Sequence, residues 1–233
     1  MLDQPPLPFA LERRFTEADF REAPSNAAAT DWLRRTSAWP GGRLALWGEA
    51  GCGKTHLLHV WAARNGAALW RGPALRGLPE LPDVPGLALD DADAAGDETG
   101  LLHLLNATAE AHVPVLLASR APPARWLTRL PDLASRLRAI TAIEIGPPED
   151  ALLQALLARL LADRQLRLPE PVQAWLLLRL PRTAAALRDA VARLDVAALA
   201  RQQTITIAFA RNVLRDEISG TDGDHSPKNS PVL

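Results

Sequence analysis

The chain has 233 residues, 48% of them hydrophobic, and its formal net charge at pH 7 is −1. This length suits one or two domains with an apolar core, and the near-zero charge gives no electrostatic reason to expect nucleic-acid binding. The single cysteine excludes an internal disulfide, and no apolar run approaches the ~20 residues that span a bilayer. We therefore expect a cytoplasmic protein without a membrane segment.

The first 22 residues are expected to form an extension without a core of their own. They include a proline-dense apolar stretch, Pro5-Pro6-Leu7-Pro8-Phe9, and proline at that density precludes a helix. Ser25-Asn26 then precedes an alanine-rich stretch to Thr36, which predicts a capped helix. We interpret 1–22 as an extended segment and place the start of the first domain at residue 23.

A phosphate-binding loop is the most specific motif in the chain. Residues 48–55 have the sequence GEAGCGKT, which fits G-x-x-x-x-G-K-[ST]. Arg43–Trp47 before it predicts a buried strand, and Thr55–Arg64 after it predicts a helix. In such a loop the backbone N–H groups and the helix N-terminus hold an anion. The sequence therefore predicts a site for a nucleoside triphosphate or diphosphate with Mg²⁺, and a chance glycine-rich turn is the alternative.

Strands and helices alternate on both sides of this loop. Further strands are predicted at 67–70, 87–89, 113–118 and 140–145, with helices at 99–112 and 130–137 and a proline-rich loop at 71–86. Several of these strands are apolar on both faces, which is typical of a parallel sheet covered by helices on both sides. We expect an α/β nucleotide-binding domain over residues 23–146.

The strand at 87–89 ends in two aspartates. In an α/β sheet the carboxyl ends of the strands face the ligand crevice, so Asp90 is placed to hold Mg²⁺ together with Thr55. Asp91 is a candidate for orienting the attacking water. An acidic surface turn is the alternative interpretation, because Asp93, Asp97 and Glu98 follow closely.

The pattern of the sequence changes at Gly146-Pro147-Pro148, from alternating strands and helices to helices alone. Leucines then recur at helical spacing from Leu152 to Leu161, and further helices are predicted at 172–180, 183–200 and 207–218. We expect a helical domain over 147–218 that packs against the first, and a polar, disordered tail at 219–233.

Two segments carry a resemblance to a known family. Gly53-Lys54-Thr55-His56-Leu57-Leu58-His59 and Leu130-Pro131-Asp132-Leu133-Ala134-Ser135-Arg136-Leu137 resemble the initiator-type AAA+ ATPases related to DnaA. The resemblance extends over roughly residues 10–215 and implies an AAA+ core, with a parallel sheet between helices, followed by a small helical lid. It also implies that Arg136 is an arginine finger, acting in trans on a neighbouring molecule's γ-phosphate.

The resemblance implies that the nucleotide is ADP or ATP, and it assigns further residues to the nucleotide site. The predicted nucleotide-binding set comprises the loop and three residues outside it: Gly48, Glu49, Ala50, Gly51, Cys52, Gly53, Lys54, Thr55, Asp90, Ser119 and Arg182. The choice of the lid arginine stays open, because a gap-free match puts Ala185 at that position, with Arg182 and Arg188 about one turn to either side.

The extent of the chain narrows the resemblance to the short Hda group of DnaA-related proteins. No DNA-binding domain fits after the lid, so we expect no sequence-specific DNA binding. Gln4, Leu7 and Phe9 have the form Q-x-x-L-x-F, which resembles the peptide that docks replication proteins on the DNA polymerase III sliding clamp (its beta subunit). The resemblance implies that DnaA and this clamp are partners, with self-association possible.

Two other classes of function compete with a regulator that triggers hydrolysis of ATP on DnaA. One is a free-standing ATPase, such as a helicase loader, which would turn over ATP rapidly by itself. The other is a docking module in which the nucleotide only stiffens the fold. The resemblance to Hda implies an ADP-bound working state with weak intrinsic ATPase activity.

Overall fold

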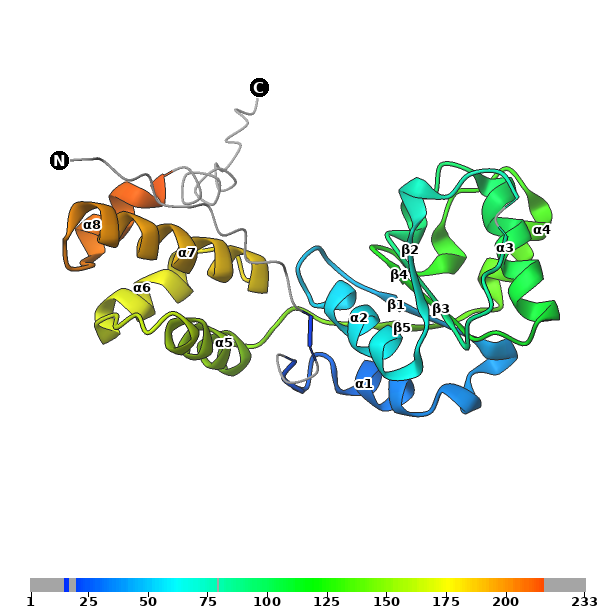
Figure 1. Ribbon diagram of the computed structural model, residues 1–233, viewed down its shortest axis with the longest axis horizontal. Coiled ribbons are helices and arrows are strands. Elements are labelled where there is room, and N and C mark those ends of the chain that lie inside the picture. The colour runs from blue at the N-terminus through cyan, green and yellow to red at the C-terminus, as the bar shows by residue number, and fades with distance from the viewer. Residues whose placement is uncertain (1–14, 17–19, 79, 216–233) are drawn as a thin grey trace, which may run out of the picture.

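The computed structural model describes residues 15–16, 20–78 and 80–215 (Figure 1). Gln4, Leu7 and Phe9 and the predicted tail at 219–233 lie outside these residues. Within the described part of the chain, the helices fall short of the length and apolar character that a bilayer span needs.

Five parallel strands form one sheet in the order β2-β3-β4-β1-β5. Their bounds are β1 Arg43–Trp47, β2 Ala68–Arg71, β3 Leu87–Asp90, β4 Val115–Ser119 and β5 Thr141–Glu144. β4 was predicted to begin at Val113, but Pro114 has no N–H to donate to the ladder, and its carbonyl instead accepts from Leu87 N at 2.9 Å. β1 lies inside the sheet, where both of its faces are covered.

Helices cover both faces of the sheet (Figure 1). They are α1 Ala27–Arg34 and α2 Lys54–Asn65 on one face, and α3 Glu98–Glu110 and α4 Pro131–Arg138 on the other. The side chains of β1 show why both faces need a cover. Leu44 and Leu46 pack in the α1–α2 layer, while Ala45 packs in the α3–α4 layer. Successive side chains of a strand point to opposite faces, so an uninterrupted apolar strand must be buried on both faces. The predicted α/β sandwich is confirmed.

The connections carry short 3-10 turns: η2 Thr36–Ala38, η3 Pro40–Gly42, η4 Gly72–Ala74, η5 Ala92–Ala94 and η6 Pro123–Arg125. The segment 71–86, predicted as loop, has one such turn and sends Leu75 into the core under α3. Leu75 is 4% exposed although the described residues of its segment form no longer element after β2. This connection is therefore anchored to the sheet domain.

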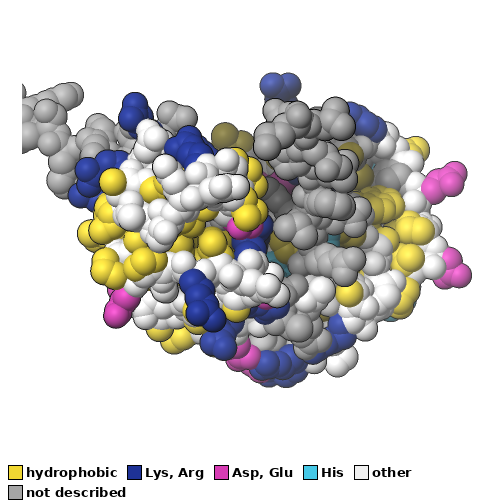
Figure 2. All heavy atoms as spheres, turned by 60° about the vertical axis from the view of Figure 1, so that its left-hand side comes forward, with side chains coloured by type: hydrophobic (Ala, Val, Ile, Leu, Met, Phe, Trp, Pro, Cys, Tyr) yellow, Lys and Arg dark blue, Asp and Glu magenta, His cyan; other side chains and the backbone are white. Residues whose placement is uncertain are grey.

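The outer surface shows no single block of basic residues on the face seen in Figure 2. Arginines there are dispersed among apolar and uncharged side chains. Since only two of the 26 basic residues are lysines, arginine is the usual cation everywhere in this chain. A single exposed arginine therefore carries little information without its surroundings.

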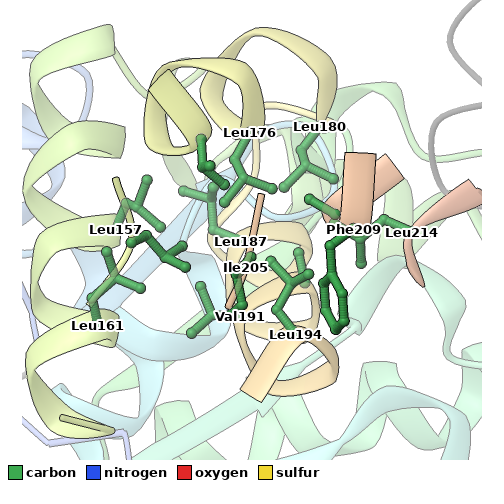
Figure 3. Close-up of a cluster of buried hydrophobic side chains, with 14 of the residues drawn as sticks. Leu157, Leu161, Leu176, Leu180, Leu187, Val191, Leu194, Ile205, Phe209 and Leu214 are labelled. Carbon is green, nitrogen blue, oxygen red and sulfur yellow. The ribbon is translucent and has the colours of Figure 1, made fainter. Parts of the chain in front are cut away.

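A separate helical domain follows β5 (Figure 1). It consists of α5 Asp150–Asp163, α6 Glu170–Arg179, α7 Ala184–Arg201 and α8 Ile207–Val213. Its core is leucine-rich, and Figure 3 shows side chains from all four helices meeting there: Leu157, Leu161, Leu176, Leu180, Leu187, Val191, Leu194, Ile205, Phe209 and Leu214. This core contains no residue of the sheet domain, so the helical domain has its own apolar interior.

Hydrogen bonds tie the start of α1 to the linker between the two domains. Gly146 N donates to Ser25 O at 3.0 Å, and Ser25 Oγ donates to Glu149 Oε2 at the same distance. The backbone N–H of Glu149 itself, and after it the hydrogen bonds from Ser25, hold the pKa of Glu149 below its usual value, although burial opposes them. The linker is thus anchored next to the residues that lead into α1.

Candidate functional site

The phosphate loop leaves β1 and enters α2 through three glycines with positive φ. Gly48 has φ +152°, Gly51 +83° and Gly53 +107°, values that L side chains rarely adopt. A Cβ on Gly48 would lie 2.4 Å from Ile145 O, so space as well as backbone conformation demands glycine there. At Gly53 nothing lies within 4 Å, and only the left-handed conformation at the start of α2 demands it.

Lys54 lies back over its own loop. Its Nζ donates to Gly48 O at 2.7 Å and to Glu49 O at 2.8 Å, and it lies 3.6 Å from Cys52 Sγ. A phosphate oxygen would be a stronger acceptor for the Lys54 ammonium group than these two carbonyls, because a hydrogen bond between two charged groups is stronger than one to a neutral group. Glu49 and Ala50 are exposed, and Cys52 is half-buried.

Thr55 and Asp90 meet across the loop. Thr55 Oγ1 donates to Asp90 Oδ2 at 3.0 Å, although the two residues are 35 positions apart. Asp90 is 8% exposed and ends β3, which neighbours β4 in the sheet. A hydroxyl and a carboxylate at this separation are the oxygen ligands that Mg²⁺ uses in phosphate-loop proteins. The residues present fit such an ion.

Asp91 has a different partner. It takes a left-handed conformation, with φ 50°, and its Oδ2 accepts from Arg71 Nη2 at 2.8 Å. The hydrogen bond to Asp91, and then the charge of that carboxylate, raise the pKa of Arg71. β2 and β3 pair in a register that puts Arg71 opposite Asp90, which brings the arginine to the aspartate pair. The predicted water-orienting carboxylate is thus held by a cation.

Ser119 is the last residue of β4 and is 1% exposed. Its Oγ donates to Ala121 O at 2.8 Å, which turns the chain after the strand. The next residue, Arg120, donates its backbone N–H to Asp93 Oδ2 at 2.9 Å. Ser119 was predicted to follow the strand, and the structure includes it at the strand's end, beside Trp47 of β1 in the register.

Arg182 is held by the linker. Its Nη1 lies 2.6 Å from Asp150 Oδ1, and its Nη2 donates to Pro148 O at 3.0 Å. Thr183, the next residue, caps α7 by accepting from Ala186 N at 3.1 Å. Ala185 lies in the first turn of α7, and Arg188 about one turn further along. Two nitrogens of the Arg182 guanidinium are therefore already bound to residues of the linker between the domains.

Thr183 brings the helical domain onto the phosphate loop. A Cβ placed on Gly51 would lie 2.6 Å from both Thr183 Cβ and Cγ2. The α7 N-terminus, with its partial positive charge, therefore lies beside the loop. This approach was not evident from the sequence, because it depends on the packing of two domains.

Arg136 lies far from this loop. It belongs to α4, whose end leads into β5, and β5 begins opposite Leu44 near the start of β1. Its positive charge, after burial, helps to lower the pKa of Arg43, the first residue of β1. The phosphate loop follows the opposite end of that five-residue strand, a span of ~13 Å at about 3.3 Å per residue.

Arg136 is half-buried, and its Nε is a buried atom without a hydrogen-bond partner among the described residues. Asn106 Oδ1 is in the same condition. Buried polar atoms in native proteins are nearly always paired, so each such atom needs an explanation.

The fold and the phosphate loop define an AAA+ protein with a helical lid. Among solved structures, domain III of the replication initiation protein DnaA from Thermotoga maritima matches with a TM-score of 0.72 at 20% identity, covering 88% of this chain and 97% of that one. AMPPCP-bound DnaA from Aquifex aeolicus matches with a TM-score of 0.64 at 17% identity, covering 83% and 70%.

A more distant AAA+ fold also matches. The RuvB Holliday junction branch migration motor of Thermotoga maritima has a TM-score of 0.59 at 17% identity, covering 75% of this chain and 61% of that one. Sequence identities of 17–20% to these structures show that the fold is shared and nothing more. The lid adds a finer assignment, since residues 150–214 match the family described as Hda, lid domain. The chain therefore has the AAA+ fold that DnaA shares, and its helical domain matches the Hda lid-domain family.

Proposed function

We propose that this protein regulates replication initiation by stimulating hydrolysis of the ATP held by DnaA. In this proposal it binds ADP or ATP with Mg²⁺ at its own loop, through Lys54, Thr55 and Asp90, and it works in the cytoplasm. The lid match to Hda and the likeness to DnaA domain III support a role beside DnaA. The Thr55–Asp90 contact at 3.0 Å supports Mg²⁺-dependent nucleotide binding.

The position of Arg136 is the observation that carries the proposal. It lies at the strand-start end of the sheet, whereas Lys54 and Gly48 lie at the strand-finish end. An arginine finger at the position of Arg136 cannot reach a nucleotide bound at Lys54 of the same chain, so its guanidinium acts on a triphosphate held by a neighbouring molecule. Such a group stabilises the charge of the transferring phosphoryl and is worth ~10³–10⁵ in rate.

The second part of the proposal is docking on the sliding clamp through Gln4, Leu7 and Phe9. These residues lie outside the described part of the structure, so their support is the sequence pattern alone. An extended, proline-stiffened segment loses little conformational entropy on binding, and Leu7 and Phe9 alternate onto one side as apolar anchors.

The decisive experiment measures ATP hydrolysis by DnaA in the presence of clamp loaded on DNA. We expect Arg136→Ala to remove the stimulation and to leave ADP binding intact. Arg138→Ala is the matched control, because Arg138 lies on the same helix and is exposed. Persistent stimulation by Arg136→Ala would refute the finger assignment.

Clamp docking has its own test. We expect wild type to be retained on immobilised clamp and the double variant Gln4→Ala plus Phe9→Ala to pass through. Equal retention of both would remove the docking proposal while leaving the finger proposal standing.

The competing function is a free-standing ATPase such as a helicase loader. The pairing of Asp91 with Arg71 argues against rapid turnover, because the guanidinium at 2.8 Å occupies the carboxylate oxygen that would otherwise accept from the attacking water. Fast hydrolysis by the isolated protein, together with binding to helicase in place of clamp, would favour the competitor.

A further inference from the structure

Two leucines of the sheet domain are exposed on loops that meet at the start of α3. Leu127, in the connection from β4 to α4, is 99% exposed, and Leu78, in the connection from β2 to β3, is 73% exposed. A single exposed leucine is common on protein surfaces and needs no explanation. Two leucines from remote segments, both held at one place by their backbones, are the mark of an interaction site.

The loop that carries Leu78 is held by Asp97, the N-cap residue of α3. The Asp97 carboxylate accepts from Gly77 N at 2.7 Å and from Gly100 N at 2.8 Å. A Cβ on Gly100 would lie 2.8 Å from Gly77 O, so the backbone just before Leu78 lies directly against the first turn of α3.

The loop that carries Leu127 is held by the next residue, Glu98. The Glu98 Oε2 accepts from Thr128 Oγ1 at 2.8 Å and from Arg129 N at 2.9 Å, directly after Leu127. These two hydrogen bonds lower the pKa of Glu98, so its carboxylate stays ionised at neutral pH. On the other side of Leu127, Trp126 packs against the α3–α4 layer. The exposed Leu127 therefore has an anchored neighbour on each side.

The surroundings of Leu127 are basic. From Arg120 to Pro131 the sequence has three arginines and no acid, and Arg125 and Arg129 are exposed on either side of Leu127. Apolar anchors among arginines fit a protein surface that has apolar pockets bordered by carboxylates. Single-stranded nucleic acid fits less well, because its bases stack on aromatic side chains and the exposed anchors here are leucines.

The same segment continues into α4, which carries Arg136 and lies beside α3 (Figure 1). The backbone from Leu127 to Pro131 spans at most about 14 Å, and α4 adds about 8 Å from Pro131 to Arg136. An interface of standard size covers about 800 Å² on each partner, which is roughly 30 Å across. The leucines and the proposed finger therefore fit within one interface.

We propose that Leu78 and Leu127 are the apolar anchors of a docking surface for the neighbouring DnaA molecule, whose matching surface offers apolar pockets bordered by carboxylates. This inference rests on the proposed function and names the surface that binds the partner, whereas Arg136 acts on the nucleotide of the docked partner. Because both loops are fixed before binding, docking costs little conformational entropy. The leucines thus contribute to affinity and not to the chemical step.

The test measures the hydrolysis of DnaA-bound ATP, with clamp on DNA present, as a function of DnaA concentration. We expect Leu78→Ser plus Leu127→Ser to raise the concentration at half-maximal stimulation about tenfold or more, because two apolar contacts are lost. The maximal rate and the Tm should not change, and Leu127→Ser alone should give a smaller shift. Leu178→Ser plus Leu199→Ser is the matched control, since it removes two lid leucines that are 78% and 73% exposed. The control should match wild type.

The arginines supply a second test of the partner's chemistry. Arg125→Glu plus Arg129→Glu should also raise the half-maximal concentration, and the difference from wild type should shrink as salt screens the charges. A charge-reversed variant that docks as well as wild type at low salt would contradict a carboxylate-bordered partner surface.

Retention on immobilised DnaA separates this inference from the proposed function, because retention needs no hydrolysis. Equal retention of wild type and the Leu78–Leu127 double variant would overturn the docking surface. A lower maximal rate at an unchanged half-maximal concentration would overturn it too. If the double variant loses retention on immobilised clamp, or loses self-association in size-exclusion chromatography, while it still binds DnaA normally, the surface belongs to another partner and the inference is wrong. Full stimulation by Arg136→Ala would instead refute the finger and leave the retention result standing.

Discussion

Thr183 of the lid lies directly against Gly51 of the phosphate loop. A Cβ on Gly51 would lie 2.6 Å from the Thr183 Cβ and methyl carbon, closer than real Cβ contacts come. Thr183 is also the cap of α7, since its Oγ1 accepts from Ala186 N. The contact joins the two domains at the position where a bound phosphate would lie, so the lid and the loop are expected to move together.

This contact predicts that Gly51→Ala weakens nucleotide binding by displacing the lid. We expect the Kd for ADP to rise by about tenfold or more, equivalent to ~1.4 kcal/mol, measured by isothermal titration calorimetry. Gly77→Ala is the control, because Gly77 also has positive φ (+59°) but nothing within 4 Å of its added Cβ. If both variants bind ADP equally well, the contact does not couple the domains.

The Thr55–Asp90 pair predicts how binding depends on Mg²⁺. Thr55→Ala removes the hydroxyl that donates to Asp90 Oδ2, whereas Thr55→Ser keeps it. We expect wild type and Thr55→Ser to bind ATP more tightly with Mg²⁺ than with EDTA, and Thr55→Ala to lose most of this difference. A similar Mg²⁺ effect in all three proteins would show that the ion is held elsewhere.

The Arg71–Asp91 ion pair predicts a gain of activity. Removal of the cation frees the carboxylate, so Arg71→Gln should raise the intrinsic rate of ATP hydrolysis several-fold. The double variant Arg71→Gln with Asp91→Asn should lose that gain, because the freed group is then absent. Phosphate release under single-turnover conditions measures both. An unchanged rate in Arg71→Gln would remove Asp91 from the list of groups that act on water.

The lid core predicts a large difference between two leucines of α6. Leu176 is 0% exposed and Leu178 is 78% exposed. Leu176→Ala should lower the free energy of unfolding by about 2–5 kcal/mol, because it removes buried methyl groups and leaves a cavity. Leu178→Ala should change it by less than about 0.5 kcal/mol. Urea denaturation of the full chain measures both, and equal effects would contradict the packing shown in Figure 3.

His59 predicts a dependence of stability on pH. Burial lowers the pKa of His59, while the charge of Asp90 partly opposes the shift. Between the folded-state pKa and the unfolded value of about 6.5, the unfolded chain binds more protons. The free energy of unfolding should therefore rise with pH through this window, level off above it, and fall on acidification.

The pH dependence is measured by urea denaturation in buffers from about pH 5 to about pH 8, which span the unfolded pKa. His59→Gln should flatten the profile across the window while leaving the carboxylate-dependent loss at lower pH. An identical slope in wild type and His59→Gln would assign the effect to another group.

Much of the fold was predictable because its signals are local. The glycines of residues 48–55 predict a backbone with positive φ, and the apolar run before them predicts a strand buried on both faces. The position of Asp90 at the end of β3 follows from the same periodicity. Element ends were less predictable: α1 stops at Arg34 and not at Thr36, and β4 begins at Val115 and not at Val113.

The sequence alone determined the phosphate loop and the alternation of strands and helices, because spacing along the chain carries both, and the resemblance to DnaA-related ATPases added the AAA+ expectation. Tertiary structure alone decided which charged groups meet. The pairing of β2 with β3 brings Arg71 to Asp91, and the domain linker captures Arg182. Ion pairs depend on distances between segments remote in sequence, and no local pattern encodes those distances.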